Sequence, residues 1–270
     1  MQQDYRALTM AQLDQLEKQT LRVLVQAVQQ YSREAKDIFE NTAATSKTEV
    51  IVLAEDLVQY ALEVAECFPI NKRFAGFIDY KRARWLSTPF GIFPQFLLVD
   101  AKASTENNRE TLQQSQLPLD AEFVSEGKVV KLAAGVPPHR EIAATSGKTL
   151  VAVTTSAFIH FYYEDLNATE TPYRRLKAIY LMSVPHQRLK SVYNPNATKT
   201  FFGQGKHSPA RQEDPRIRVY FSRLKEICPW RLQELHFPAD GGNGGYAKPV
   251  WRDVDDAGAA TETEFSFLGR

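Results

Sequence analysis

The sequence predicts an α/β protein in which a mixed central β-sheet is flanked by helices. The first part of the chain has apolar side chains at intervals of three and four residues, the spacing of one helical face. The runs that follow are short and rich in branched and aromatic residues, which is typical of buried strands. Because segments of helical character alternate with these runs, we expect helices on both faces of the sheet.

Two helices are expected before the first strand. Residues 9–39 carry one apolar face, so they predict a long first helix. That face fits either packing in the core or contact with another subunit. A second helix is expected through VIVLAEDLVQYALEVAECF, with Ser46 or Thr48 as its cap and Pro69 at its end.

Strands are predicted where branched and aromatic residues gather in short runs. These runs are FAGFIDY (74–80), FPQFLLVDAK (93–102), LVAVTTSAFIHFYY (150–163), KAIYLMSV (177–184) and RIRVYF (216–221). The runs at 150–163 and 177–184 are almost wholly apolar, so we expect them in the centre of the sheet.

The segments between the strands are polar or rich in glycine and proline. Ser104 or Thr105 would cap a polar helix through ENNRETLQQSQ. Residues 129–148 predict loops or a short hairpin. GGNGG at 241–245 predicts a surface loop and not a domain boundary, so we expect a single domain over residues 1–270 with peripheral additions.

The composition excludes several classes of protein. With 43% hydrophobic and 24% charged residues among 270, the chain is typical of a globular protein and not of a disordered one. Cys67 and Cys228 are too few for a disulfide framework or a zinc site, and we expect both to be reduced. Neither a leader pattern nor a membrane-spanning apolar run is present, so we expect a cytoplasmic protein without membrane contact.

The charge is unevenly distributed along the chain. The net charge is only +1, which taken alone argues against unspecific nucleic-acid binding. Between Pro172 and His236, however, there are 13 Lys and Arg against 4 Asp and Glu. This basic region fits a surface that binds a polyanion, although a solvated face is the commoner explanation of such a region.

An acid and a lysine end the predicted strand 93–102. Asp100 and Lys102 are two residues apart, so in a strand they project from the same face. Acid-x-Lys also occurs elsewhere in the chain, but only Asp79 and Asp100 follow predicted strands. If these two strands lie side by side, their ends bring two carboxylates together beside Lys102.

Two carboxylates and a lysine are suited to phosphodiester hydrolysis. Asp79 and Asp100 would hold Mg²⁺ with water left on the ion. Lys102 would orient or deprotonate the attacking water, or stabilise charge on the phosphate. Glu55 on the second helix is a further candidate ligand, although the several acids of that helix also fit a solvated face. The alternative for Asp100 and Lys102 is a surface ion pair worth under about 1 kcal/mol.

Longer stretches of the sequence carry a family resemblance. VIVLAEDLVQYALEVAE, RFAGFIDYKRARWL, LLVDAKASTE, GKHSPAR, RIRVYFSRLKE and CPWRLQELH resemble the SfiI-type type II restriction endonucleases of the PD-(D/E)xK nuclease superfamily. Asp79, Asp100 and Lys102 match the active-site positions of that signature. Ile78 stands where the name of the signature has proline, and the second acid is Asp, but neither departure removes a metal ligand.

The resemblance implies a fold, an activity and partners. It implies a restriction endonuclease-like core and a type II site-specific deoxyribonuclease that cuts double-stranded DNA with Mg²⁺. The implied target is the interrupted palindrome GGCCNNNNNGGCC, and the implied assembly is a homotetramer built from two dimers. A cognate DNA methyltransferase of the same restriction-modification system is also implied. Half-sites centred about nine base pairs apart suit a two-fold dimer, because they lie near one helical turn apart.

Basic residues near the C-terminal half are candidates for reading the DNA. Arg216 and Arg218 alternate with apolar residues, so a strand would show both guanidinium groups on one face. Arginine is the commonest partner of guanine in the major groove. Phosphate binding and a plain surface strand are the alternatives. Further candidates for contact with bases or phosphates are Lys206, Ser208, Arg211 and Arg109.

Two other functions remain open at this point. The protein could be a regulator that binds DNA without cutting it, although intact Asp79, Asp100 and Lys102 argue against this. It could also be a repair or recombination nuclease that reads the structure of DNA and not its sequence. The alternation of Arg216 and Arg218 and the family resemblance argue against that.

Overall fold

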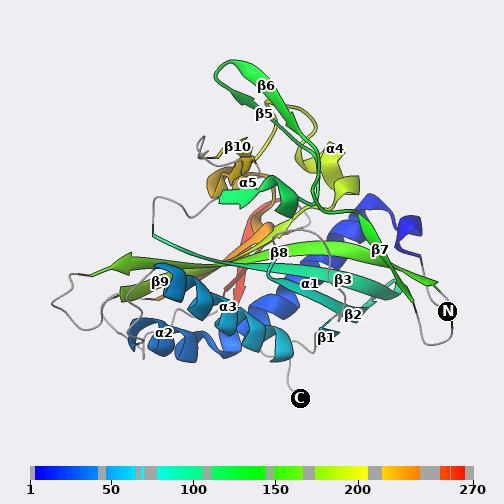
Figure 1. Ribbon diagram of the computed structural model, residues 1–270. Helices are drawn as coiled ribbons and strands as arrows, with labels where there is room; N and C mark the ends of the chain where they lie inside the picture. The colour runs from blue at the N-terminus through cyan, green and yellow to red at the C-terminus, as the bar shows by residue number, and fades with distance from the viewer. Residues whose placement is uncertain are drawn as a thin grey trace.

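The structure is a computed structural model built around one mixed β-sheet (Figure 1). It describes residues 4–41, 47–64, 68–69, 78–105, 111–143, 147, 149–166, 174–205, 215–237, 250–255 and 257–264. Strands of the sheet follow the order β1-β2-β3-β8-β9-β12, and β7 pairs with β8. Their bounds are β1 Phe68–Pro69, β2 Tyr80–Thr88, β3 Gly91–Ser104, β7 His139–Ala143, β8 Thr149–Asp165, β9 Arg174–Val184 and β12 Leu232–His236.

Strand β3 lies in the middle of the sheet and reaches the site described below. It runs parallel to β8 on one side and antiparallel to β2 on the other. Phe96, Leu97, Leu98 and Val99 are all buried, because helices and loops cover both faces of the strand. A continuous apolar run of this kind is what a strand covered on both faces requires. The predicted strands at 93–102, 150–163 and 177–184 are therefore confirmed.

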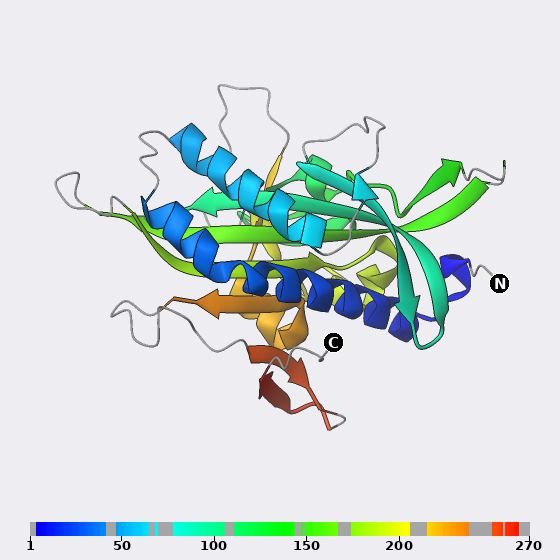
Figure 2. The same ribbon diagram turned by 90° about the horizontal axis from the view of Figure 1, so that it is seen from below.

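Three helices cover one face of the sheet, as the view from below shows (Figure 2). They are α1 Met10–Gln30, α2 Ser32–Asn41 and α3 Lys47–Val64. Thr9 caps α1 in a reciprocal capping box with Gln12. The apolar stripe of α1 is buried in the core, so packing in the core is the alternative that the structure shows for it.

The predicted helix over 9–39 is divided in two at Tyr31. The amide of Tyr31 donates to Val28 O at 3.2 Å, and the hydroxyl of Ser32 donates to Gln29 O at 2.8 Å. Such short-range bonds compete with the regular helical pattern and favour a bend. The axis therefore changes direction, and α2 places Phe39 against the rings of Phe161 and Tyr163.

Smaller elements lie on the other side of the sheet (Figure 1). A second sheet has the order β10-β11-β4, and a hairpin of β5 and β6 projects beyond it. Their bounds are β4 Thr111–Gln113, β5 Ala121–Ser125, β6 Lys128–Leu132, α4 Lys190–Tyr193, β10 Phe202–Gln204, β11 Arg216–Val219 and α5 Phe221–Ile227. Single turns of 3-10 helix are η1 Tyr5–Ala7, η3 Gln114–Gln116, η4 Gln187–Leu189 and η5 Pro229–Arg231, and a last hairpin joins β13 Val250–Val254 to β14 Ala260–Glu264.

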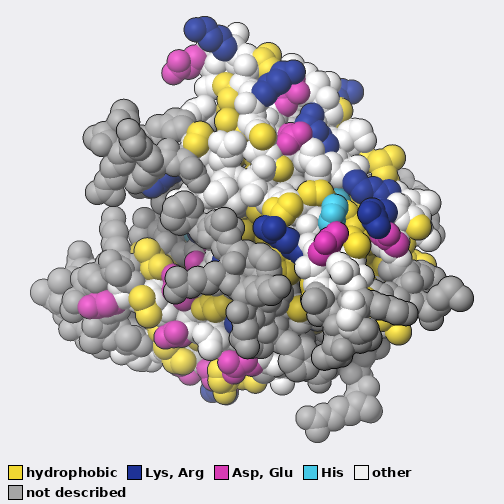
Figure 3. Space-filling model, turned by 45° about the vertical axis from the view of Figure 1, so that its right-hand side comes forward, with side chains coloured by type: hydrophobic (Ala, Val, Ile, Leu, Met, Phe, Trp, Pro, Cys, Tyr) yellow, Lys and Arg dark blue, Asp and Glu magenta, His cyan; other side chains and the backbone are white. Residues whose placement is uncertain are grey.

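The projecting hairpin carries charges of both signs (Figure 3). Glu126 and Gly127 form its two-residue turn with φ of 50° and 73°, which closes an antiparallel pair with the twist that the strands need. Glu122 on β5 lies 3.5 Å from Lys131 on β6 and 3.8 Å from Lys190 on α4. The positive charge of the hairpin's basic side chains is thus partly offset by acidic side chains.

One sequence prediction is wrong in these parts of the chain, and two are right only in part. Residues 111–116 do not form the expected helix, because Thr111–Gln113 pairs with Arg216–Arg218 and only the single 3-10 turn η3 follows. Residues 129–148 were expected as loops or a short hairpin: β6 does form a short hairpin with β5 and residues 133–138 are a loop, but β7 pairs with β8 in the main sheet. The strand predicted at 216–221 is present as β11 in the small sheet, but it ends at Val219 because Phe221 begins α5.

Some predictions fall on residues that the structure does not describe. These are the GGNGG loop at 241–245, Cys67, most of the strand expected at 74–80, and the first half of the helix expected at 106–116. Cys228 is buried and carries a free thiol, as predicted. Among the helices of the described ranges, none combines the length and apolar character that a membrane span needs.

A buried ion cluster joins the first helix to the second half of the chain. The guanidinium of Arg231 is fully buried, with Nη2 2.7 Å from Glu17 Oε2 and 2.5 Å from Asp14 Oδ1. The same group stacks over the rings of Tyr193 and Trp230 at 4.2 and 4.4 Å. The cluster fixes α1 against η5 because a buried charge is tolerated only with such partners.

We expect Arg231→Ala to lower the free energy of unfolding by about 3–5 kcal/mol, because it leaves Glu17 buried without its counter-ion. Arg6→Ala is the control, since Arg6 pairs with Asp4 on the exposed surface and its loss should leave the free energy of unfolding nearly unchanged. Denaturant unfolding of the two variants measures the difference. Equal small losses would show that the cluster is not a stabilising contact.

Candidate active site

The antiparallel pairing of β2 with β3 brings two acids together. Tyr80 lies opposite Val99, so Asp79, just before β2, comes beside Asp100 near the end of β3. The sequence argument had Asp79 at the end of a strand, which is wrong: the residue precedes its strand. The expected meeting of the two acids still occurs, because the start of one antiparallel strand faces the end of its neighbour.

Each site residue is held by specific contacts. Asp79 Oδ2 accepts a hydrogen bond from the amide of Ala101 at 2.7 Å. Lys102 Nζ lies 2.6 Å from Asp100 Oδ2, which agrees with the prediction that the two project from one face. The side-chain Nε2 of Gln116 donates to Asp100 Oδ1 at 2.9 Å, and the side-chain Oε1 of Gln116 accepts from Lys102 Nζ at 3.3 Å.

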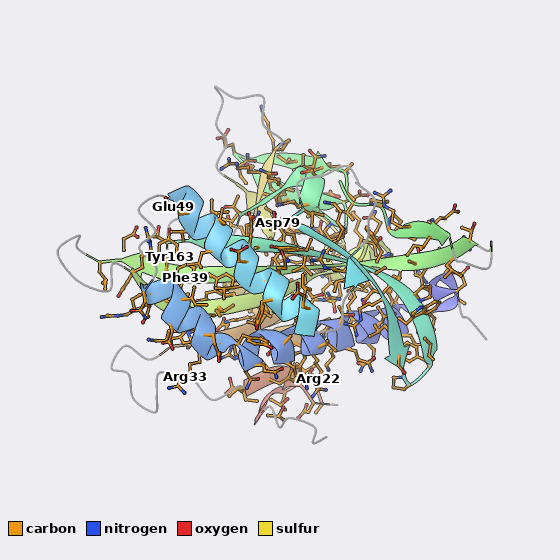
Figure 4. All side chains as sticks on the ribbon, turned by 60° about the horizontal axis from the view of Figure 1, so that its bottom comes forward. Arg22, Arg33, Phe39, Glu49, Asp79 and Tyr163 are labelled. Atoms are coloured by element: carbon orange, nitrogen blue, oxygen red, sulfur yellow. The ribbon has the colours of Figure 1, made fainter. Side chains whose placement is uncertain are left out.

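These groups line one cavity of about 340 Å³ that opens beside α3. Glu55 on α3 faces the same cavity, and its backbone carbonyl accepts a hydrogen bond from the hydroxyl of Tyr80. Figure 4 shows the labelled Asp79 over the sheet next to α3. The lining also includes residues of β3, β4 and β11, namely Ala101, Ala103, Ser104, Thr111, Leu112, Gln113 and Arg216, together with Ile51 of α3.

The acids of this cavity are held in an environment that disfavours their negative charge. Burial is the largest influence on Asp100 and raises its pKa to about 6; the positive charge of Lys102 opposes this rise and the negative charge of Asp79 adds to it. Burial of the carboxylate also raises the pKa of Asp79, and the hydrogen bond from the amide of Ala101 opposes this rise. Asp79 as a whole residue is nevertheless exposed. Burial and the neighbouring charges of Asp79 and Asp56 raise the pKa of Glu55.

The donor set fits a hard divalent cation. Oδ2 of Asp100 is buried, and apart from the ion pair with Lys102 no described group makes a well-aligned hydrogen bond to it. Asp79 and Glu55 offer further carboxylate oxygens in the same cavity. No three His, Cys, Asp or Glu of the described ranges are gathered into a ready-made metal cage. Mg²⁺ needs none, because one or two carboxylates with water and substrate phosphate commonly hold it.

The two arginines of β11 lie near this cavity. Ile217 and Val219 are fully buried, whereas Arg216 and Arg218 lie on the opposite, solvent-facing side of the strand, as the alternation predicted. Arg216 lines the cavity itself, and the guanidinium of Arg218 lies 5.1 Å from the ring of Tyr220. The other predicted DNA-contact residues, Lys206, Ser208, Arg211 and Arg109, lie outside the described residues.

Gln116 is the site residue that the sequence argument missed. It lies in a segment that resembles a polar helix, and a glutamine in such a segment gives no signal of its own. Only the pairing of β4 with β11 turns η3 toward the cavity and places the amide against Asp100 and Lys102.

Comparisons with known proteins agree on one family. The family model of type II restriction enzyme SfiI matches residues 37–235. The type II restriction enzyme SfiI of Streptomyces fimbriatus is 63% identical over 272 residues, covering 100% of both chains. The crystal structure of tetrameric restriction endonuclease SfiI bound to cognate DNA has a TM-score of 0.90 and 62% identity, covering 100% of both chains.

A more distant structure shares the fold alone. The crystal structure of the restriction endonuclease BglI bound to its DNA recognition sequence has a TM-score of 0.63 and 15% identity. The match covers 83% of this chain and 90% of the BglI chain. The mixed sheet with its flanking helices is therefore an arrangement that restriction endonucleases of unlike sequence also adopt.

Proposed function

Because this chain belongs to the family of the type II restriction enzyme SfiI, it is a type II restriction endonuclease, and we propose that Asp79, Asp100 and Lys102 are its catalytic residues. The observation that carries the proposal is the meeting of these three side chains in one cavity. The substrate is the phosphodiester backbone of double-stranded DNA. The family resemblance first read from the sequence is confirmed.

The cofactor of the proposed reaction is Mg²⁺, held by Asp79 and Asp100 with Glu55 as a further ligand. When bound there, the ion supplies positive charge to the scissile phosphate and acidifies a coordinated water. The carboxylates fix where the cation would be held, and the amide of Ala101 holds Asp79 in place. Lys102, beside Asp100, orients the attacking water or stabilises charge on the phosphate.

Arg216 and Arg218 are proposed to contact the DNA from β11. Their shared face is fixed by the burial of Ile217 and Val219. Bidentate arginine contacts to guanine suit a target with GGCC half-sites, since each half-site has guanines on both strands. The target GGCCNNNNNGGCC is thus proposed for this chain, and Lys206, Ser208, Arg211 and Arg109 are proposed as further contacts.

A homotetramer is proposed as the working assembly. The relative at 62% identity is a tetramer bound to cognate DNA, and this chain matches its whole length. A two-fold dimer suits a palindromic target, and two dimers can hold two target sites at once. A DNA methyltransferase of the same specificity is the expected companion, since it protects the host's own sites.

We expect Asp100→Ala to lower the cleavage rate at least about 100-fold, because it removes a carboxylate from the proposed cation site. Binding to target DNA without metal should persist, since Asp100 makes no favourable contact with a phosphate. Digestion of a plasmid with one target site and a filter-binding assay measure the two quantities. Asp56→Ala is the control: Asp56 lies on α3 beside Glu55 but outside the cavity lining.

A chelator tests the cofactor in the same assay. EDTA should stop cutting by the native protein, and added Mg²⁺ should restore it. Retained Mg²⁺-dependent cutting by Asp100→Ala would refute the proposed site. Sequencing of the fragment ends from the native digest gives the target and the cut position.

Arg218→Ala should weaken binding to DNA with GGCC half-sites by about 1–3 kcal/mol and binding to random duplex far less. Arg175→Ala is the control, because Arg175 pairs with Glu164 at the start of β9, in the main sheet. Titration of both DNAs at one salt concentration gives the comparison. Equal losses on the two DNAs would mean that Arg218 contacts phosphate, which carries no sequence information.

If the working form is a tetramer that holds two sites, DNA with two target sites should be cut faster than DNA with one at equal site concentration. The second site on one molecule binds at a high effective concentration. Native mass or sedimentation gives the oligomeric state independently. Identical rates on both substrates together with a dimeric mass would contradict the proposed assembly.

A further inference from the structure

Gln116 makes contacts that go beyond filling space. Its side chain is almost fully buried, and its Nε2 donates to Asp100 Oδ1 at 2.9 Å. Its Oε1 accepts from Lys102 Nζ at 3.3 Å and from the backbone amide of Gln113 at 3.0 Å. One amide group therefore contacts both the acid and the base of the Asp-x-Lys pair.

The contact with Gln113 fixes which way the amide faces. A backbone N–H can only donate, so the oxygen of Gln116 must lie toward Gln113. The NH₂ group is then left to face the carboxylate of Asp100, and the oxygen also meets the ammonium of Lys102. Both contacts are charge-assisted, which makes them stronger than ordinary amide hydrogen bonds.

Gln116 is also tied closely to the strand that presents the arginines. Thr111 and Gln113 on β4 lie opposite Arg218 and Arg216 on β11. The amide of Gln114 donates to Pro215 O at 2.9 Å, so the pairing continues past the end of β4. The chain passes from β4 directly into η3, and η3 carries the side-chain amide that contacts Asp100. A shift of β11 would therefore move η3 with it.

We propose that Gln116 is a positioning residue that holds Asp100 and Lys102 in place and links them to the DNA-reading strand β11. This rests on the proposed function, in which Asp100 and Lys102 are catalytic and β11 contacts the bases. Gln116 does not touch the DNA in this proposal. It acts by fixing the distance between the acid and the lysine, and by transmitting the position of β11 to them.

The substitution Gln116→Met tests the positioning role. Methionine has nearly the same volume but no donor and only a weakly accepting sulfur, so packing is kept and the hydrogen bonds to Asp100, Lys102 and Gln113 are lost or much weakened. The single-turnover cleavage rate at saturating Mg²⁺ and target DNA should fall about 10- to 100-fold, as expected for a small misplacement of catalytic groups. The dissociation constant for target DNA in EDTA should stay unchanged.

Two further variants sharpen this test. Gln116→Glu keeps size and the acceptor but places a second carboxylate against Asp100, so its rate should fall further than that of the methionine variant. Gln114→Met is the matched control, because Gln114 lies in the same turn and donates to Ala133 O, away from the cavity. Its cleavage rate should match that of the native protein.

The link to β11 is tested by a double-mutant cycle of Gln116→Met with Arg218→Ala. If Gln116 transmits the position of β11, the two effects on the single-turnover rate at saturating DNA should not be additive. Additive effects would overturn the link. A native rate in Gln116→Met, or equal losses of rate, DNA binding and thermal stability, would overturn the positioning role, because a merely structural residue weakens all three together.

The outcome for Gln116 can be told apart from the outcome for the proposed function. If the native protein does not cut DNA, or Asp100→Ala still cuts it, the proposed function fails. If the native protein cuts, Asp100→Ala does not, and Gln116→Met is as fast as native, then only the inference about Gln116 fails.

Discussion

The register between β2 and β3 is the constraint on which the proposed site depends. Tyr80 opposite Val99 puts Asp79 beside Asp100, and the alternation of β3 then places Lys102 next to the same acid. A slip of one residue would move the side chains of β2 to the other face of the sheet and separate the acids. The pairing of the strands from Tyr80 to Thr88, and the burial of Leu97 and Val99, make that slip costly.

Holding the two acids side by side opposes the stability of the folded chain when no cation is bound. Moving the pKa of Asp100 from 3.8 to about 6 corresponds to roughly 3 kcal/mol against the ionised form. This cost remains although Lys102 already opposes the rise, and Gln116 and the amide of Ala101 hold the two acids through further direct contacts. The large core around the sheet offsets the cost, so the site can remain poised for a divalent ion without unfolding the strand ends.

The sequence predicted what depends on local pattern and left out what depends on pairing. The strands at 93–102 and 177–184 could be read because their apolar runs leave few alternatives. Asp100 and Lys102 could be placed on one face by the two-residue period alone. The secondary structure of residues 111–116 could not be predicted from the sequence, because the polar residues suit a helix. Only pairing with Arg216–Arg218 makes β4 a strand. The contacts of Gln116 could not be predicted for the same reason, because that pairing decides where η3 faces.

In the small sheet β10-β11-β4, alternate residues of β11 face opposite sides because of strand geometry. Ile217 and Val219 anchor β11 in the core, so the alternate residues Arg216 and Arg218 have little freedom to shift relative to the main sheet. Thr111–Gln113 is bonded along β11, and the chain leaves β4 directly into the turn that contacts Asp100. The strand β11, which carries the proposed reading groups, is therefore bonded to β4, and the turn after β4 contacts the proposed cutting groups on β3. If β11 reads the bases as proposed, a poorly matched DNA that displaces β11 also displaces the Asp100–Lys102 pair, and the proposal then implies discrimination between DNA sequences during cleavage as well as during binding.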